Sequence, residues 1–497
     1  QSVSTSDGKT WIAFYHENNG NYELWAQLLD INGYKLLETN GMLVSSQTSG
    51  TDLFGINLCL DNTNNLVIAC QDQRNGTLQA VLYKISQAGA QLWNPAGVIV
   101  GSGYSPYPCP ISNNETAVVW NDTEYNTLRI VTLASDGTVF QPAASFQPIT
   151  VDASNTVRGQ IVENYSGFTV VFQVPGEGIS STLYSLLYTN TNEFGFYIPP
   201  YLPLKLSDQL TYSDRYYSLV AENDTTYVGY HCVSGTRTNS FLQRINPDGT
   251  IPWGMNGSNF NTSVGQDDHY QGLTQVNFAT GSDFVWSVCT FSTPDEIMHG
   301  VYIQKFLKTT GARQFTDAAK IVYPISTSNN QQGGSLALVD DTPMFISYNA
   351  DYKIYATRLD GDGNFVWPGN SVELSSTTTT SVTPKILFNF TAEESDQFAV
   401  IWSENRGINY LGYAQGITSG GLVGIDVFTQ GDVPPVINTE GGTLQMEAMV
   451  IPSTANQSVT WSIIPGTGAA TIDTTGLMTA QSNGTVWAKA TSVQDTF

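Results

Sequence analysis

The sequence is poor in charged residues, in basic clusters and in long apolar runs. Charged residues make up 12% of the 497 residues, and 43 acidic residues against 19 basic ones give a net charge of −24. Nucleic acids and anionic membranes are bound through clustered lysines and arginines, and no such cluster occurs, so both are excluded as partners. No stretch reaches the roughly 18–20 apolar residues that span a bilayer, which excludes direct membrane insertion.

Cysteine is also scarce. The sequence has no Cys-x-x-Cys pair and no cysteine–histidine spacing of a zinc site, so we predict no metal centre. Cys59 and Cys70 flank a turn-like segment and could face each other across a hairpin, but we favour free thiols packed as small apolar core residues. The five cysteines are Cys59, Cys70, Cys109, Cys232 and Cys289.

Composition and the first residue indicate an exported, β-rich protein. Aromatic residues reach 11% and there are 45 glycines, while the apolar runs are short, which predicts a folded β protein rather than a disordered chain. The chain begins at Gln1 rather than at a methionine, and Asn, Ser and Thr are abundant. We therefore expect a processed N-terminus and an extracellular location.

The main signal is an internal repeat. A short apolar strand ends on an aromatic residue followed by a polar or acidic one, and eight copies follow one another at a period of about 55 residues. The copies occupy residues 12–17, 67–72, 117–122, 169–173, 227–231, 284–287, 344–349 and 399–404.

Each copy is followed by further strand and turn signals. A second strand alternates apolar and polar residues, as in 24–28 and 301–305, and a polar turn ending in glycine comes next, as in 30–33 and 246–249. Glycine supplies the positive φ that such hairpin turns require. An aromatic residue then opens the last strand, at Trp93, Phe140, Trp253, Phe315 and Trp367.

Four short strands per unit, repeated around a ring, form the blade pattern of a β-propeller. We predict an all-β protein with an eight-bladed β-propeller over residues 1–429, and a seven-bladed ring is the alternative. Residues 1–7 would supply the first strand and residues 421–428 the last. The unit around residues 180–208 lacks the Asp-Gly turn and the following tryptophan, so we expect an irregular blade there.

Two segments of the repeat also resemble a known family. The run YATRLDGDGNFVWPGNSVEL at residues 355–374 and the Asp-x-Arg-x-Gly pattern of Asp72, Arg74 and Gly76 resemble a propeller repeat of large secreted proteins from Bacteroidetes-type bacteria. The resemblance covers roughly residues 1–428. It implies a fold and an exported surface protein, and it implies no particular activity.

The tail is a separate module. Pro434 and Pro435 break the repeat. Residues 430–497 then resemble the group 2 bacterial Ig-like domain, through Val459-Thr460-Trp461-Ser462, residues 470–473 and residues 475–477. The resemblance implies a β-sandwich with Trp461 in its core. Because such a domain has one more strand, we expect the native protein to continue beyond Phe497, with a C-terminal sorting domain among the missing parts.

Candidate catalytic residues are few. Sialidase-like chemistry needs clustered arginines and a Tyr/Glu pair, whereas the nine arginines here are scattered. Asp7 and Gly8 resemble a sialidase Asp-box, but we interpret them as a hairpin turn. The densest titratable cluster is the candidate site Asp267, Asp268, His269 and Tyr270. We favour a solvated loop over an acid/base group there, because no partner motif completes a site.

A binding surface is predicted from the loops that lead into the blades. In a propeller these loops share one face around the central channel, and tyrosines beside polar side chains stack on sugars and hydrogen-bond to them. The candidate binding residues are Tyr104, Tyr107, Asp214, Arg215, Tyr216 and Tyr270.

Two further patterns are interpreted as structural. His16 and His231 occupy the repeat position that Gln71 and Asn121 hold elsewhere. The acidic turn at residues 360–364 has the charge for calcium, but no calcium-loop spacing with a distal glutamate accompanies it. We therefore predict no cofactor.

The sequence favours an exported, non-catalytic binding protein of the cell surface, used in adhesion, glycan contact or gliding-type motility. By the resemblance, export would follow the type IX route to the extracellular face of the outer membrane. The partner would be a glycan or a surface protein. One alternative is a polysaccharide-active glycosidase or lyase, and another is a scaffold subunit that binds a surface or secretion-system protein.

Overall fold

The structure is a computed structural model of the whole chain. It describes residues 1–30, 33–47, 55–140, 147–152, 154–178, 180–190, 197–198, 202–212, 217–234, 237–262, 270–279, 281–293, 295, 297–327, 330–367, 369–375, 381–388, 397–405, 410–418, 424–451 and 457–493.

The chain forms two compact units, Gln1–Gln415 and Gly416–Phe497. The sequence-based boundary lay between residues 429 and 430. Among the described residues there is no α-helix, and no helix is long and apolar enough to cross a membrane. The short 3-10 helices are η1 (Arg74–Gly76), η2 (Ser112–Asn114) and η4 (Gln430–Asp432).

The first unit consists of antiparallel sheets whose strands follow one another in chain order. The first three sheets contain β1 (Ser2–Ser4), β2 (Thr10–Asn18), β3 (Asn21–Leu29) and β4 (Met42–Ser45); β5 (Ile56–Leu60), β6 (Leu66–Asp72), β7 (Gln79–Ile85), β8 (Val98–Ile111), β9 (Glu115–Asp122), β10 (Thr127–Leu133) and β11 (Gln147–Ile149); and β12 (Val157–Asn164), β13 (Gly167–Pro175), β14 (Ser180–Asn190), β15 (Tyr197–Ile198), β16 (Leu204–Lys205) and β17 (Thr211–Tyr212).

The remaining sheets of this unit follow the same order. They contain β18 (Ser218–Glu222), β19 (Thr225–Ser234), β20 (Arg237–Ile245) and β21 (Ser258–Asn259); β22 (Tyr270–Asn277), β23 (Phe284–Ser292), β24 (His299–Leu307) and β25 (Lys320–Ser326); β26 (Gln332–Val339), β27 (Thr342–Tyr348), β28 (Ile354–Arg358) and β29 (Val372–Glu373); and β30 (Ser381–Phe388), β31 (Gln397–Asn405) and β32 (Tyr410–Thr418).

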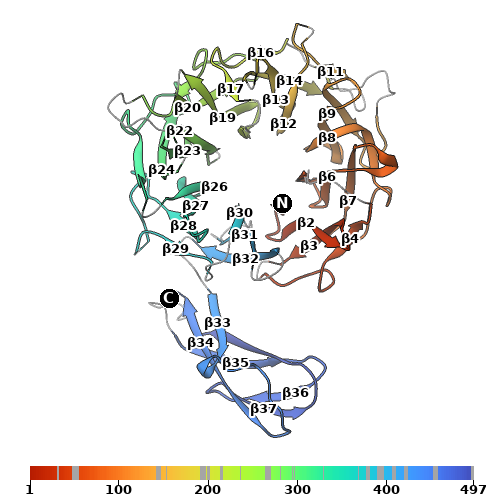
Figure 1. The fold of residues 1–497 in the computed structure, drawn as a ribbon, viewed down its shortest axis with the longest axis vertical. Coiled ribbons are helices and arrows are strands. Elements are labelled where there is room, and N and C mark those ends of the chain that lie inside the picture. The colour runs from red at the N-terminus through yellow and green to blue at the C-terminus, as the bar shows by residue number, and fades with distance from the viewer. Residues whose placement is uncertain are drawn as a thin grey trace. The chain divides into compact units, whose positions relative to one another are not determined.

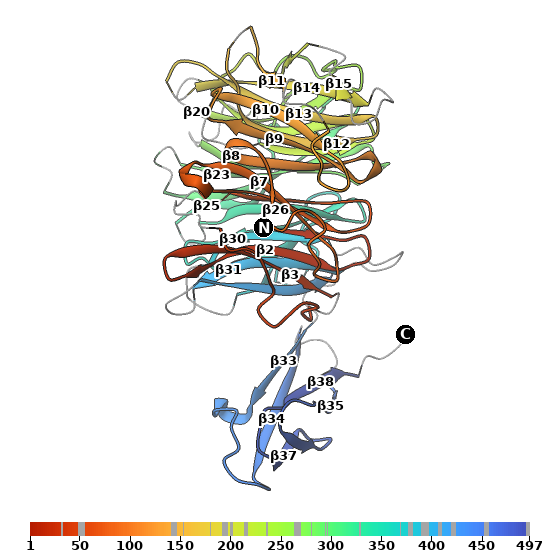
Figure 2. The same cartoon turned by 90° about the vertical axis from the view of Figure 1, so that its right-hand side faces the viewer.

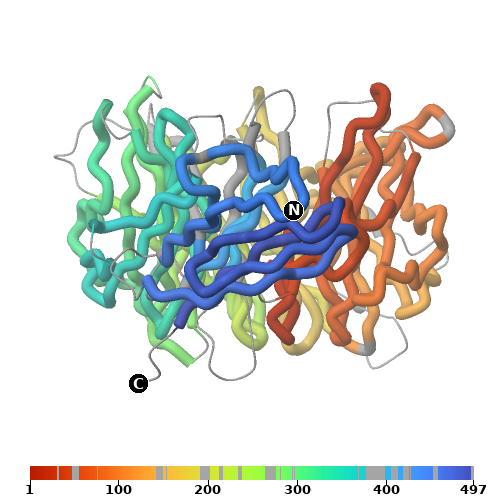
Figure 3. Tube along the Cα trace, turned by 90° about the horizontal axis from the view of Figure 1, so that it is seen from below, coloured from red at the N-terminus to blue at the C-terminus, as the bar shows by residue number. Residues whose placement is uncertain are grey.

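These sheets stand radially in a ring (Figure 1). The innermost strands β1, β5, β8, β12, β18, β22, β26 and β30 each contact the next, and β30 returns to β1. Seen edge-on, the strands run along the ring axis and the loops gather on its two faces (Figures 2 and 3). This is the architecture of a β-propeller, and we call the strands from one innermost strand to the next a blade.

Strand β8 joins two blades. Its first half pairs with β7 at the outer edge of one blade, and its second half pairs with β9 as the innermost strand of the next. The irregular blade expected around residues 180–208 is also present, because three short strands, β15, β16 and β17, pair with different parts of β14 in place of one outer strand.

The repeat signals of the sequence have direct structural counterparts. The recurring apolar segment is the second strand of each blade, and β6 and β9 are buried at every position. The glycine turns are hairpins in which the glycine N–H donates back across the turn, as Gly33 does to Asp30 and Gly249 to Asn246. The Asp-box-like segment is a hairpin of this kind, since Gly8 donates to Thr5.

In three of the units the aromatic residue after the turn packs onto the next blade. Trp93 lies against Gly137, and its indole N–H donates to the carbonyl of Ser135 at 2.8 Å. Trp253 lies against Gly311 in the same way, and Phe315 lies against Gly363. The glycines therefore serve both the turn and the close approach of an aromatic ring from the neighbouring blade.

The cysteines and the Asp-x-Arg-x-Gly motif both have structural roles in the first unit. All five cysteines are free and buried, and Cys59 pairs across the strand with Val67 rather than with Cys70. The Arg74 guanidinium binds both carboxylate oxygens of Asp72, at 2.8 and 2.6 Å, and also the hydroxyl of Tyr83. This motif is a structural clamp at the end of β6.

The second unit has two sheets, one of β33 (Gly424–Thr429), β34 (Thr443–Ile451), β37 (Leu477–Ser482) and β36 (Ala469–Ile472), the other of β35 (Val459–Ile464) and β38 (Trp487–Ser492). Trp461, expected in the core, is half-buried against Gly476. The assignment of residues 421–428 to the last blade was wrong for the described part of that segment. Strand β33 pairs with β34 over six residues, because its backbone groups find their partner in this sheet.

Candidate functional site

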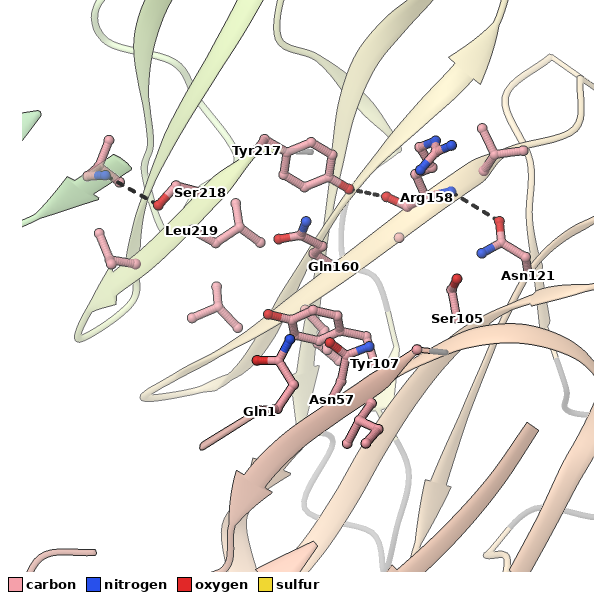
Figure 4. A pocket seen from close by; sticks show the side chains of 18 of the residues that line it. Gln1, Asn57, Ser105, Tyr107, Asn121, Arg158, Gln160, Tyr217, Ser218 and Leu219 are labelled. Carbon is pink, nitrogen blue, oxygen red and sulfur yellow. Dashed lines mark hydrogen bonds between the residues drawn. The ribbon is translucent and has the colours of Figure 1, made fainter. Parts of the chain in front are cut away.

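A cavity of about 990 Å³ lies inside the ring of innermost strands. Its walls come from β5, β8, β12, β18, β22 and β26 and from residues next to them (Figure 4). Its polar side chains include Asn57, Tyr104, Tyr107, Arg158, Gln160 and Tyr217.

A β-bulge recurs in the innermost strands and positions these side chains. The register shifts between Tyr104 and Tyr107 in β8 and between Val157 and Gln160 in β12. It shifts at the matching place in β22, β26 and β30, at Gln271/Thr274, Gly333/Leu336 and Val382/Lys385. A bulge carries one unpaired residue and re-aims its neighbours, so it turns side chains toward the channel.

The polar residue next to the end of β6 and of β9 holds the bulge of the next blade. The side-chain oxygen of Gln71 accepts the N–H of Ser105 at 2.8 Å, and that of Asn121 accepts the N–H of Arg158 at 3.1 Å. In β23 the matching position is Phe291, and its neighbour Thr290 accepts the N–H of Gly333, the residue before the β26 bulge, at 2.8 Å. Without these acceptors, N–H groups that the bulge removes from the ladder would lose their partner. The recurring polar position is therefore a clasp between blades.

We expect Asn121→Ala to lower the free energy of unfolding by about 1–3 kcal/mol, because the N–H of Arg158 loses its acceptor in a half-buried place. Urea denaturation followed by tryptophan fluorescence measures the change. Asn18→Ala, at an exposed strand end, is the control and should stay within about 0.5 kcal/mol. Equal losses in the two variants would contradict the clasp.

Two of the predicted binding residues line the cavity. Tyr104 is 38% exposed, whereas Tyr107 is half-buried, and burial raises the pKa of the Tyr107 phenol. The side-chain amide of Asn57 donates to the carbonyl of Pro106 at 2.9 Å and so fixes the bulge between the two tyrosines. One phenol thus faces solvent and the other is held in the wall.

The other predicted residues stay predictions. Asp267, Asp268, His269, Asp214, Arg215 and Tyr216 lie outside the described residues, and Tyr270 begins β22 with its side chain outside them. Tyr217, which directly follows Tyr216 in the sequence, lines the cavity. Its hydroxyl donates to the carbonyls of Arg158 and Val171.

The sequence analysis missed four residues that line the cavity, namely Arg158, Gln160, Asn57 and Tyr217. The available signal was positional, since Val157-Arg158-Gly159-Gln160 stands in the repeat where Tyr104-Ser105-Pro106-Tyr107 stands one blade earlier. Figure 4 shows Gln160 lying between Tyr217 and Tyr107. Phenol, amide and guanidinium groups in one cavity offer donors, acceptors and aromatic faces together.

The acidic turns are occupied by their own backbone. Asp360 accepts the N–H groups of Asp362 and Asn364 at 2.9 and 2.8 Å, and although partial burial opposes it, these bonds lower the pKa of its carboxyl. Within the described ranges, no group of three or more His, Cys, Asp or Glu side chains could hold a metal ion.

Comparison with known proteins identifies one module. Residues 432–497 match the family model of the bacterial Ig-like domain (group 2). No curated protein matches the chain.

Solved structures similar to the chain include several kinds of protein. A polysaccharide lyase, Uly1, matches with a TM-score of 0.43 and 9% identity over 84% of this chain and 89% of the lyase. The Aleuria aurantia lectin, in complex with Fucα1-6GlcNAc, matches with a TM-score of 0.33 and 9% identity over 65% of this chain and 96% of the lectin. The Trypanosoma rangeli sialidase matches with a TM-score of 0.35 and 9% identity over 83% of this chain and 58% of the sialidase.

Proposed function

We propose that the protein is an exported bacterial surface protein whose propeller is a non-catalytic, glycan-binding head. In this proposal the ring has eight blades, opened by the eight innermost strands. The Ig-like module is a spacer that carries the head at the extracellular face of the outer membrane, after export by the type IX route. Adhesion or gliding-type motility would use such a head.

The observation that carries the proposal is the composition of the cavity wall. Tyr104 and Tyr107 supply aromatic surface, while Asn57 and Gln160 supply amide donors and acceptors. Sugars present apolar ring faces and many hydroxyls, and this combination satisfies both. The bulges and clasps hold the wall in place before a ligand arrives, which lowers the ordering cost of binding.

A protein-binding scaffold is the second candidate, favoured by one observation. Two neighbouring blades expose apolar side chains at matching outer positions, namely Leu36 and Leu43 on the first and Leu92 and Ile99 on the second. Exposed apolar surface of this kind is found at protein interfaces. A polysaccharide-active enzyme remains the third reading, with Asp267, Asp268, His269 and Tyr270 as its proposed site.

The test is a glycan array on the full chain, with product release assayed in the same wells. We expect binding without turnover, and we expect Tyr104→Ala to weaken it about two- to tenfold, because aromatic contacts contribute about 0.5–1.5 kcal/mol. Tyr165→Ala, at a residue 87% exposed and away from the cavity wall, is the matched control and should bind normally.

Three outcomes would contradict the proposal. Product release would favour the enzyme and make His269 the first residue to replace. The absence of binding to every glycan would favour the protein-binding scaffold. A pull-down with the full chain, with Leu92→Asp as the negative control, would then follow. Unchanged glycan binding by Tyr104→Ala would indicate that the glycan binds outside this cavity.

A further inference from the structure

Arg158 is an unusual residue for the position that it holds. It is the second residue of the β12 bulge, with a φ of 55°, in the left-handed region that costs a non-glycine residue about 1–2 kcal/mol. The other innermost strands with this bulge place small residues there, namely Ser105, Gly272, Gly334 and Thr383. The fold is therefore satisfied by a small residue, and a long cationic side chain needs another reason.

The backbone of Arg158 is anchored on both sides. Its N–H donates to the side-chain oxygen of Asn121 in β9, and its carbonyl accepts the hydroxyl of Tyr217 from the residue that precedes β18 (Figure 4). Hydrogen-bond partners from both neighbouring blades thus fix the backbone position of Arg158 and, with it, the base of its side chain. An anchored backbone makes a side chain a better preorganised ligand group.

The charge of Arg158 also stands out. Among the described residues that line the cavity, it is the one whose side chain carries a formal charge at neutral pH. The whole chain has a net charge of −24 and therefore repels anions in general. A cationic side chain inside the ring can attract an anion locally. A guanidinium stays protonated and presents a planar fork of donors that matches a carboxylate with two parallel hydrogen bonds.

Resting on the glycan-binding function proposed above, we propose that the cavity selects acidic glycans and that Arg158 binds the carboxylate of a uronic acid residue. Tyr104, Tyr107 and Gln160 then contact the sugar ring and its hydroxyls. Selectivity arises because a guanidinium forms two parallel charge-assisted hydrogen bonds with a carboxylate, and the hydroxyl groups of a neutral sugar offer no charge to strengthen such bonds.

The test compares matched ligands on the full chain by isothermal titration calorimetry. The probes are oligogalacturonate, oligoguluronate and hyaluronan oligosaccharides, each beside its carboxyl-reduced, neutral counterpart, together with dextran sulfate. We expect at least one acidic glycan to bind 10–100-fold more tightly than its reduced form, with an affinity that falls as salt rises.

Arg158→Ser is the decisive variant, since Ser105 holds the same bulge position in β8 with a φ of 52°, so the fold tolerates serine there. It should lose 10–100-fold in affinity for the acidic glycan and none for the reduced one, and Arg158→Lys should lose less. Arg313→Gln removes an arginine that pairs with the exposed Asp317 outside the cavity wall and should bind normally.

The possible failures are distinguishable. If neutral and acidic forms bind equally, or Arg158→Ser changes nothing, acidic selectivity is wrong and glycan binding stands. If dextran sulfate binds as tightly as any uronate, selection of the carboxylate is wrong. If no glycan binds, the proposed function itself fails, and the selectivity fails with it.

Discussion

Replacing Asp61 by asparagine is expected to remove about 3–5 kcal/mol from the free energy of unfolding, the largest effect of any single change considered. The Oδ2 atom of the Asp61 carboxylate lies 2.8 Å from the Nζ atom of the Lys84 ammonium. The two side chains are only 2% and 3% exposed, respectively. Asp61→Asn would leave the Lys84 ammonium buried beside a neutral amide. Urea denaturation followed by tryptophan fluorescence measures the loss.

The matched control is Asp208→Asn. Asp208 pairs with Lys205 at a similar distance, 2.9 Å, but the two side chains are 61% and 40% exposed. Water screens such a pair, so its loss should cost below about 1 kcal/mol. A comparable loss in both variants would show that burial does not set the strength of the Asp61–Lys84 pair.

The same pair predicts a pH dependence. Burial alone would raise the pKa of Asp61, but hydrogen bonds from Lys84, Asn65 and Thr63 outweigh it and hold the pKa at about 2, below the ordinary 3.8. A carboxyl with a lowered folded-state pKa stabilises the fold above its ordinary pKa, and the contribution is lost as pH falls through the folded value. The gap in stability between the native protein and Asp61→Asn should therefore narrow from about pH 4 to pH 2.

Gly137→Ala is expected to have the second largest effect, about 2–5 kcal/mol. The backbone of Gly137 has a φ of +85°, which costs alanine about 1–2 kcal/mol. A Cβ there would also lie 2.8 Å from the Cγ atom of Trp93, a ring buried between blades, and such overpacking costs about 1–3 kcal/mol more. Thermal and urea denaturation of the full chain measure the sum.

Gly33→Ala separates the two costs. Gly33 holds the same place in its hairpin, with a φ of +82°, but an added Cβ would meet nothing within 4 Å. This variant should lose only the backbone part, about 1–2 kcal/mol. If Gly33→Ala and Gly137→Ala were equally destabilised, the contact of tryptophan with the glycine turn would contribute nothing to the joint between blades.

The sequence predicted the order of strands well because each blade repeats the same physical requirement. Its second strand is buried on both faces, so β6 and β9 consist of apolar runs that stand out from the polar turns. Trp93 and Gly137 could each be identified from the repeat, as an aromatic strand opening and a glycine turn. Their contact across blades depends on the ring and is visible only in three dimensions.

The residues that line the cavity were predicted only in part, for a related reason. Tyr104 and Tyr107 carry a composition typical of sugar contact, and they do line the cavity. Arg158 sits in an ordinary strand-like sequence, and its place on the wall depends on a bulge whose N–H finds an acceptor in the preceding blade. Strand β33 was misplaced because an alternating strand does not specify which sheet it joins.

The central claim is that glycans bind inside the ring, and site-directed blocking of the cavity tests it most directly. All five native cysteines are buried, so a cysteine introduced at Ser335, on the β26 wall, is the reactive one for fluorescein maleimide. Leu92→Cys, at an exposed outer turn, is labelled as the control. We predict that labelled Ser335→Cys loses at least tenfold in affinity for the best-bound glycan of the array, whereas labelled Leu92→Cys binds it normally. Full binding by labelled Ser335→Cys would place the glycan elsewhere and contradict the account.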